Sequence, residues 1–305
     1  MSQRTRWLLL LVLPALFWAG NALIARASVG QIPPVALNFW RWAVALLLLL
    51  PFTGGDLWRH RAVLLARWPH LIAQGLVSVT AYNALLYLAL QTTTAINATL
   101  VGSSLPLMVL VLGRFWLDEP IRPRAVAGIV VSAAGLVVVV SKGAPAQLLE
   151  LGLARGDGVM LLATLSWALY SVMLKRYPMP VPSYTLLTAL MIVGVAAILP
   201  FYLWELAAGA VLDPSPRNLA VIAYTALFAS LAAYYFWNKG VVIVGAATAG
   251  QYTYLIPLFA AILAVLLLDE EFHAFHGLGA ALIFGGIALA GRGPATRPGG
   301  AASRA

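Results

Sequence analysis

Ten long apolar stretches follow one another along this chain, and short polar breaks separate them. Each stretch spans roughly 17–25 residues, the length that an α-helix needs to cross a bilayer. Backbone groups in hydrocarbon must pair within their own segment, which favours helices. The pattern predicts an all-α membrane protein with ten transmembrane helices near residues 7–27, 34–52, 69–90, 95–116, 121–141, 157–176, 183–205, 217–239, 245–268 and 274–291.

The breaks contain residues that end helices. Proline fixes the backbone and lacks an N–H group, and glycine adopts conformations that other residues avoid. We therefore expect loops at Pro33-Pro34, at Thr53-Gly-Gly-Asp56 with the basic stretch 59–67, at residues 178–182 and at Asp213-Pro-Ser-Pro216.

The second half of the chain repeats the first. In each half a proline in the middle of a stretch leads through an apolar run to an acidic pair, and then to a helix with spaced glycines. Matched positions are offset by 151 residues there, and by 149 residues near the start of each half. A duplicated membrane unit is typical of transporters with a site between the halves. The matched pairs include Pro106 and Pro257, Asp118 and Asp269, Gly128 and Gly279, Gly135 and Gly286, Trp18 and Trp167, and Arg26 and Lys175.

Each repeat holds five predicted spans, an odd number, so the second repeat must enter the membrane in the opposite orientation. We assign residues 1–145 to the first five-helix repeat and residues 146–291 to the second, inverted one. Residues 292–305, rich in Gly, Pro, Ala and Arg, form a cytoplasmic tail that we expect to be disordered. Two inverted repeats can rock about a site at their interface.

Lysine and arginine predict the orientation, because they accumulate on the cytoplasmic side. With the N-terminus inside, fourteen of the 19 basic residues lie at the inner ends of the spans. Only Arg26, Lys142, Arg155 and Arg217 lie at the outer ends. We therefore predict a multi-pass membrane protein with both termini in the cytoplasm.

Composition narrows the class of protein. The 305 residues are 62% hydrophobic and 10% charged, with a mean hydropathy of +0.91, whereas soluble domains carry about 25% charged residues. The net charge of +9 follows from cytoplasmic Lys and Arg, so we expect no nucleic-acid partner. The sequence has no cysteine, no Walker motif and no constellation of His, Asp and Glu. We expect no enzymatic activity, no metal and no cofactor.

Polar and aromatic residues inside the spans are candidates for a substrate cavity, because hydrocarbon penalises polar groups. They recur at helical spacing in spans one, three and four and in the repeat partners six, eight and nine. One cavity shared by these six spans would explain them together. The candidate substrate-binding residues are Trp18, Asn21, Tyr82, Asn83, Tyr87, Asn97, Ser104, Trp167, Tyr170, Tyr234, Asn238 and Tyr252.

These candidates divide by chemistry. The rings of Trp18, Tyr82, Trp167 and Tyr252 offer flat apolar faces to an aromatic side chain. The asparagine amides can hydrogen-bond amino and carboxylate groups without adding charge. Simpler readings stay open, since a membrane asparagine often serves a helix–helix hydrogen bond and aromatic residues near span ends often form an interfacial belt.

Three further residues are candidates for gating. Pro106 and Pro257 lie in the middle of their spans, where each is either a static kink or a flexible point for opening. Arg41 is the one strongly basic residue inside a predicted span, and burying it is costly unless it is paired or reaches the interface. For Arg41 we favour a structural or gating role over substrate binding.

The stretches Ala98–Glu119 and Ala249–Glu270, each followed by a glycine-spaced helix, resemble the drug/metabolite transporter superfamily, in particular its ten-helix EamA-type branch. The resemblance covers residues 7 to about 291. It implies export of amino acids and other metabolites, and the aromatic, asparagine-bearing spans look most like the branch that exports aromatic amino acids. The chain lacks the deep first-helix glutamate typical of the related small multidrug pumps.

We therefore expect an inner-membrane exporter of amino acids, with aromatic ones first, that works by alternating access. We expect a small-molecule substrate and membrane lipid as its partners, and we treat the protein as a monomer. The alternative is an exporter of drugs, cations or other metabolites, although a cation would favour a deep carboxylate and no span carries one. An intramembrane enzyme is a less favoured alternative, because it needs a nucleophile or metal cluster and the sequence shows neither. A structural scaffold is also less favoured, because it would not need polar groups concentrated on repeat-related helix faces.

Overall fold

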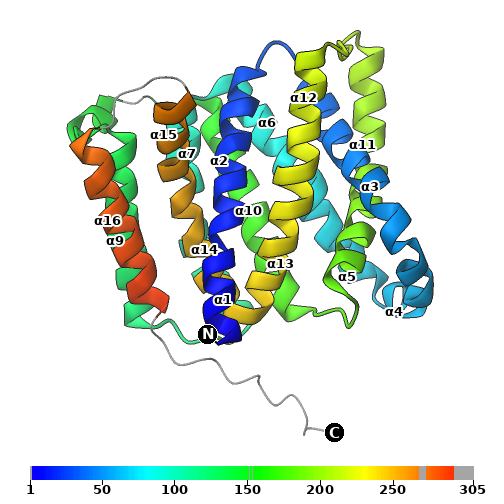
Figure 1. Cartoon of the computed structure of the whole chain (residues 1–305), viewed down its shortest axis with the longest axis horizontal. Coiled ribbons are helices and arrows are strands. Elements are labelled where there is room, and N and C mark those ends of the chain that lie inside the picture. The colour runs from blue at the N-terminus through cyan, green and yellow to red at the C-terminus, as the bar shows by residue number, and fades with distance from the viewer. Residues whose placement is uncertain (1, 151, 153, 268–272, 292–305) are drawn as a thin grey trace, which may run out of the picture.

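The molecule is a bundle of membrane-length helices (Figure 1). The structure, a computed structural model, describes residues 2–150, 152, 154–267 and 273–291. Within these residues every regular element is a helix, nine helices are long and apolar enough to cross a membrane, and Ala274–Ala290 is a shorter apolar helix. The predicted all-α membrane fold is confirmed.

The first five spans run alternately up and down the bundle of Figure 1. The short helix α4 (Arg61–Ala66) joins the second span to the third. The spans are α1 (Gln3–Leu10) with α2 (Val12–Ala27); α3 (Pro34–Arg59); α5 (Trp68–Gly75) with the π-helix η1 (Leu76–Tyr82) and α6 (Asn83–Thr92); α7 (Ala95–Gly102) with α8 (Leu105–Trp116); and α9 (Pro123–Val140).

The last five spans follow after the short 3₁₀ helix η2 (Pro145–Glu150). The start of α1 and the end of the last helix, α16, lie at the same end of the bundle, at the bottom of Figure 1, as an even number of spans requires. The spans are α10 (Arg155–Arg176); α11 (Ser183–Ala207); α12 (Pro216–Tyr224) with the π-helix η3 (Thr225–Ala232) and α13 (Ala233–Val244); α14 (Ala246–Gln251) with the 3₁₀ turn η4 (Tyr252–Tyr254) and α15 (Leu255–Leu267); and α16 (Ala274–Gly291).

The two halves share their irregular elements. The π-helix η1 begins at Leu76 and η3 begins at Thr225, which is the 149-residue offset of the repeat. The fourth span is broken at residues 103–104, and the turn η4 breaks the ninth span at the equivalent place. Discontinuous helices in corresponding positions of two repeats are a common feature of transporter sites.

Helices α9 and α16 pack antiparallel through glycines, and these contacts show the inverted repeat directly. A Cβ atom at Gly128 would lie 2.6 Å from Gly286 O, and one at Gly286 would lie 2.5 Å from Gly128 O. Gly135 and Gly279 approach in the same way, at 2.8 and 3.0 Å. Since Gly128 corresponds to Gly279 and Gly135 to Gly286, each contact is repeated by its partner, as a two-fold axis requires.

One predicted loop is helical in the structure. Helix α3 continues through Gly54 and Gly55 and ends at Arg59. The hydroxyl of Thr53 hydrogen-bonds to a side chain of α11, and Asp56 forms a 2.9 Å ion pair with Arg59 one turn later. We attribute the extra turns to these contacts, because each glycine costs a helix only about 1 kcal/mol.

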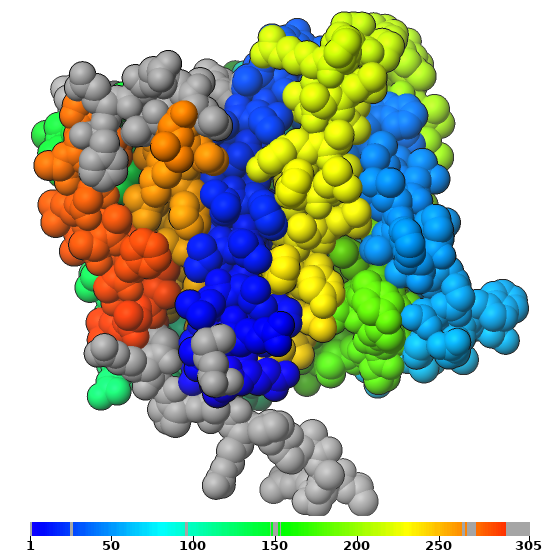
Figure 2. Space-filling model, in the orientation of Figure 1, coloured from blue at the N-terminus to red at the C-terminus, as the bar shows by residue number. Residues whose placement is uncertain are grey.

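The outside of the bundle is apolar. Phe52, Phe115 and Leu266 are 82%, 81% and 70% exposed. Figure 2 shows one such face, where α1 and α2 lie between α12–α13 and α15. Apolar surface on this scale would aggregate in water, and it suits the hydrocarbon of a bilayer. Asp269, Glu270 and the tail 292–305 lie outside the described residues.

Candidate substrate cavity

A cavity of about 140 Å³ lies between the two halves of the chain. Most of its residues come from the second halves of the first and third spans and from the first halves of the fourth and sixth spans, so it lies toward the upper end of the bundle in Figure 1. No lining residue carries a formal charge. The lining residues are Trp18, Asn21, Ala22, Tyr82, Asn83, Leu86, Leu90, Ala98, Thr99, Gly102, Ser103, Leu105, Leu136, Met160, Thr164, Trp167, Thr253, Tyr254, Ile256 and Pro257.

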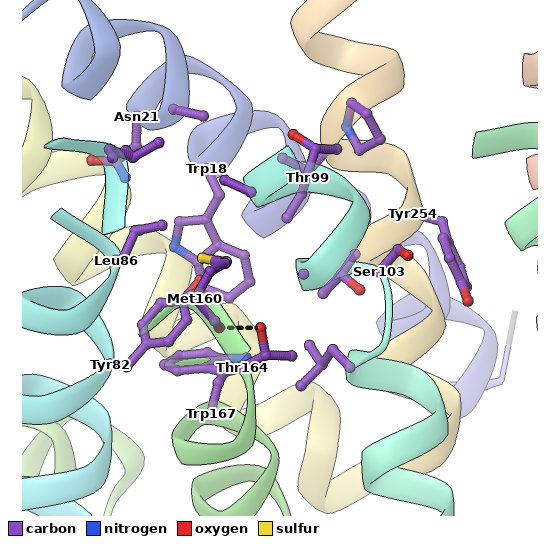
Figure 3. A pocket seen from close by; sticks show the side chains of 18 of the residues that line it. Trp18, Asn21, Tyr82, Leu86, Thr99, Ser103, Met160, Thr164, Trp167 and Tyr254 are labelled. Atoms are coloured by element: carbon purple, nitrogen blue, oxygen red, sulfur yellow. Dashed lines mark hydrogen bonds between the residues drawn. The ribbon is translucent and has the colours of Figure 1, made fainter. Parts of the chain in front are cut away.

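Aromatic rings form one side of this substrate cavity (Figure 3). The Trp18 and Trp167 rings meet edge to face, with their centroids 5.2 Å apart, and the Tyr82 ring lies 4.7 Å from that of Trp167. The indole N–H of Trp18 donates a 3.1 Å hydrogen bond to Ala229 O, which fixes the ring against η3. These predicted residues therefore meet in one apolar wall.

Two other predicted aromatic residues pack behind this wall and do not line the cavity. The ring centroids of Tyr170 and Tyr234 lie 5.2 and 5.0 Å from that of Trp167, and Trp237 lies 5.6 Å away. Tyr170 donates a 2.7 Å hydrogen bond to Asn238 Oδ1. The cluster holds Trp167, which is 2% exposed, in place.

Oxygen atoms line the opposite side. Figure 3 shows Thr99, Ser103 and Tyr254 across the cavity from the tryptophans. Ser103 donates its hydroxyl proton to Leu100 O, and its oxygen lone pairs remain available as acceptors. The carbonyls of Gly102 and Thr253 cannot receive the usual hydrogen bond from four residues on, because residues 106 and 257 are prolines without an N–H; Thr253 O accepts from the N–H of Leu255 instead.

Arg41 is buried beside the substrate cavity and does not reach the interface. Arg41 is 1% exposed, and its guanidinium donates to Asn83 Oδ1 at 2.9 Å and Tyr87 Oη at 2.6 Å through Nη1. Its Nε donates to Ser230 Oγ at 2.9 Å. Ser230 belongs to η3 and Asn83 follows η1, so the arginine ties together the two π-helical segments of the repeat.

Asn83 and Asn21 are both buried in the cavity wall. The amide of Asn83 donates to Ser78 O at 3.1 Å and to Tyr234 Oη at 3.0 Å. Asn21 Oδ1 accepts a 3.3 Å hydrogen bond from Tyr87. Tyr87 itself faces a smaller hollow near α3 and does not line the substrate cavity.

Four other predicted site residues lie elsewhere. Asn97 donates to Asp157 Oδ2 at 3.1 Å and so helps to hold the start of α10. Ser104 bonds to its own helix at Val101 O, and Asn238 lies in the aromatic cluster. Tyr252 is buried, and its neighbours Thr253 and Tyr254 face the cavity instead.

The two prolines lie at the helix breaks. Pro257 lines the substrate cavity, and Pro106 is buried outside it at the start of α8. A Cβ atom at Gly250 would lie 3.5 Å from Pro106 Cα, so the broken helices of the two repeats cross there. Whether the breaks bend during transport stays a prediction.

Several lining residues were not among the sequence candidates, namely Thr99, Ser103, Thr164, Thr253 and Tyr254. A hydroxyl in a span can bond to its own helix and so resembles a structural residue in sequence. The repeat does carry a signal for three of them. Ser103 and Tyr254 are offset by 151 residues, and Thr253 corresponds to Gly102 of the cavity.

A second cavity, of about 110 Å³, lies at the opposite end of the bundle. Glu119 and Lys175 form an ion pair there that joins the two halves of the chain. We call it the lower cavity. Its lining residues are Arg4, Leu110, Glu119, Pro120, Arg122, Ala125, Lys175, Ile243, Val244, Gly245, Ala247, Thr248, Gln251 and Ala290.

The model of the EamA-like transporter family matches this chain twice, at residues 5–141 and 154–292. The chain belongs to this family. It is therefore a multi-pass membrane transporter of the EamA type, and the two matches fall on its two similar halves.

Relatives of this EamA-like protein carry the same general description. It is 29% identical over 291 residues to an uncharacterized transporter from Archaeoglobus fulgidus, and the alignment covers 95% of this chain and 98% of the relative. It is 24% identical over 284 residues to the uncharacterized transporter YyaM from Bacillus subtilis, covering 90% of each. A solved crystal structure shares the fold, with a TM-score of 0.77 at 23% identity over 94% of this chain and 97% of that one.

Proposed function

We propose that this EamA-like transporter exports amino acids, aromatic ones first, and related metabolites across the bacterial inner membrane. One observation carries the proposal. An uncharged cavity between the two repeats presents tryptophan and tyrosine rings on one side and oxygen atoms on the other. A small molecule with a flat apolar body and a polar end matches both sides.

The contacts can be assigned by chemistry. An aromatic side chain can stack on Trp18, Tyr82 and Trp167, with about 0.5–1.5 kcal/mol per ring pair. An ammonium group can donate to the hydroxyl of Ser103 or to the carbonyl of Gly102. Drug-sized molecules occupy pockets of roughly 300–1,000 Å³. The smaller cavity of about 140 Å³ favours a small metabolite.

Transport would proceed by alternating access between the substrate cavity and the lower cavity. With the termini in the cytoplasm, as the basic residues predict, the substrate cavity belongs to the outer half of the membrane. The Glu119–Lys175 ion pair would then hold the cytoplasmic end together in this conformation. Opening of that end would separate the pair, and the helix breaks before Pro106 and Pro257 would absorb the bending.

Uptake into proteoliposomes tests this function. Purified protein would be reconstituted and offered labelled phenylalanine, alanine, leucine and a cationic dye, with and without a pH gradient. We expect phenylalanine to exchange against trapped unlabelled phenylalanine faster than alanine does. Exchange of the dye with no amino-acid exchange would overturn the proposal in favour of cation export, and empty liposomes give the background.

A further inference from the structure

Arg41 brings an unbalanced positive charge to the wall of the substrate cavity. Among the described residues no carboxylate lies within ion-pair distance of its guanidinium. Its hydrogen-bond partners, Asn83, Tyr87 and Ser230, are all neutral. It also lies 5.2 and 5.9 Å from the ring centroids of Trp42 and Tyr87, contacts that spread the charge and do not neutralise it.

The hydrogen bonds from Arg41 have only one possible direction. A guanidinium can only donate, so Tyr87 Oη accepts from Nη1. The hydroxyl proton of Tyr87 is then free to be donated, and it goes to Asn21 Oδ1. The Asn21 side chain is therefore oriented with its oxygen toward the arginine and its NH₂ group away from it.

The NH₂ group of Asn21 lies at the end of this chain of hydrogen bonds from Arg41 through Tyr87. Asn21 lines the substrate cavity, and its Nδ2 atom forms no hydrogen bond with any described residue. The neighbouring amide of Asn83 is different, because both of its ends are already bonded within the protein. The Asn21 NH₂ group is thus an unoccupied hydrogen-bond donor at the cavity wall. It is polarised by the buried Arg41 guanidinium, which is two hydrogen bonds away through Tyr87.

We propose that Asn21 receives the carboxylate of the substrate, with Arg41 supplying the charge through Tyr87. This inference rests on the proposed export function and narrows its substrate class. The substrates would be small organic carboxylates with an apolar body, and an amino group would not be required. Asn21 is the binding residue, and Arg41 and Tyr87 are positioning residues.

The charges around the cavity support an anion over a cation. The nearest acidic residue along the lining helices, Asp157, lies one turn before Met160 on α10. Its carboxylate is already held by Thr93, by the Asn97 amide and by the backbone N–H of Ala154. It does not line the cavity. A cationic substrate would therefore meet the field of Arg41 without a free counter-ion.

Equilibrium binding of matched ligands tests the inference. The full chain in lipid nanodiscs would be titrated by calorimetry with 3-phenylpropionate, its neutral amide and 2-phenylethylamine. We expect the carboxylate to bind at least about tenfold more tightly than the amine, because Asn21 Nδ2 donates to an anionic oxygen and the positive charge of Arg41 opposes an ammonium. Equal or tighter binding of the amine, or no binding of the carboxylate, would overturn the inference.

Two variants separate recognition from folding. Asn21→Asp keeps the shape but replaces the neutral amide, with its NH₂ donor, by a negatively charged acceptor. It should therefore lose most of the carboxylate affinity and gain affinity for the amine. Arg41→Gln keeps donors but removes the cation, so it should weaken binding of the carboxylate by a larger factor than binding of the neutral amide. Unchanged carboxylate binding in folded Asn21→Asp protein would contradict the assignment.

Transport of the same ligands distinguishes this inference from the export function. Exchange of the amine or a cationic dye, with no exchange of any carboxylate, would leave an exporter and remove the carboxylate site. Tight carboxylate binding without any exchange would keep the site and remove the export proposal. If a variant does not fold, the comparison of carboxylate, amide and amine binding to the wild-type protein still tests the inference.

Discussion

Trp167 both lines the cavity and centres the aromatic cluster behind it, so its loss would change packing and substrate contact together. Tyr82 is a cleaner probe of the substrate contact. Its ring lies at the cavity, 4.7 Å from that of Trp167, and its hydroxyl forms no hydrogen bond with a described residue. Tyr252 is a matched control, a buried tyrosine on a neighbouring segment that does not line the cavity.

We expect Tyr82→Leu to raise the KM for phenylalanine about 2- to 10-fold, the equivalent of one lost ring pair. The KM for leucine should change little. Tyr252→Leu should leave the ratio of the two KM values as in the wild type. Initial rates of uptake into proteoliposomes measure both ratios, and an equal loss for both substrates in Tyr82→Leu would reduce Tyr82 to a packing residue.

The structure brings only some of the predicted site residues to the cavity. Trp18, Asn21, Tyr82, Asn83 and Trp167 line the cavity, and their roles in substrate binding stay predictions. Asn97, Ser104, Tyr170 and Asn238 make polar contacts inside the protein, because a polar group in a span satisfies itself equally well within the bundle. Only the rotation of each helix decides between the two outcomes, and spacing alone does not fix it.

Among the elements, the α9–α16 pair gives a sharp stability test. Gly286 and Gly285 are neighbours in α16, and only Gly286 faces the partner helix. A Cβ atom there would lie 2.3 Å from Ser132 Oγ and 2.5 Å from Gly128 O, whereas Gly285 has open space. Gly286→Ala should therefore destabilise the fold by about 1–3 kcal/mol, as overpacking does.

Gly285→Ala should be neutral or slightly stabilising, because alanine favours the helix. Thermal unfolding in detergent, followed by tryptophan fluorescence, would compare the two variants. Equal melting temperatures for both would show that α9 and α16 separate readily at this contact.

The broken helices give a second test at the element scale. Replacing Pro106 or Pro257 by Ala should restore a helical hydrogen bond and stiffen the break. We expect slower exchange with little change in protein level. Pro51→Ala is the control, because Pro51 lies inside the intact helix α3 and faces outward. Full-rate exchange by the double variant at residues 106 and 257 would make both breaks static.

The sequence predicted where these elements lie but not their internal breaks. Apolar run length sets a span, and each observed span agrees with its predicted range apart from shifts at the ends, the longest being the continuation of α3 to Arg59. The π-helices η1 and η3 have no comparable signal. Side chains satisfy several of their backbone carbonyls, as Asn83 of the same span and Tyr234 of the eighth span do for Ser78 O, and as Ser230 does for Thr225 O.

At the scale of the whole molecule, two cavities lie at opposite ends of a bundle built from inverted repeats. The repeat was visible in sequence as a constant offset, and the reciprocal glycine contacts of α9 and α16 confirm it. Which cavity is larger in this conformation depends on how the helices tilt, which no local pattern encodes. Alternating access is therefore the claim that most needs a direct measurement.

Cysteine labelling can measure this directly, because the chain has no native cysteine and a thiol-reactive reagent would label only the one introduced. Ser103→Cys would place a thiol in the substrate cavity, and Thr248→Cys would place one in the lower cavity. Each would be labelled in proteoliposomes with a membrane-impermeant maleimide from the side that its cavity faces, with and without phenylalanine. We expect rapid labelling at residue 103 and slow labelling at residue 248 without substrate, and a reciprocal shift when phenylalanine drives exchange. Labelling rates that stay the same at both positions, or that rise together, would contradict alternating access between these two cavities.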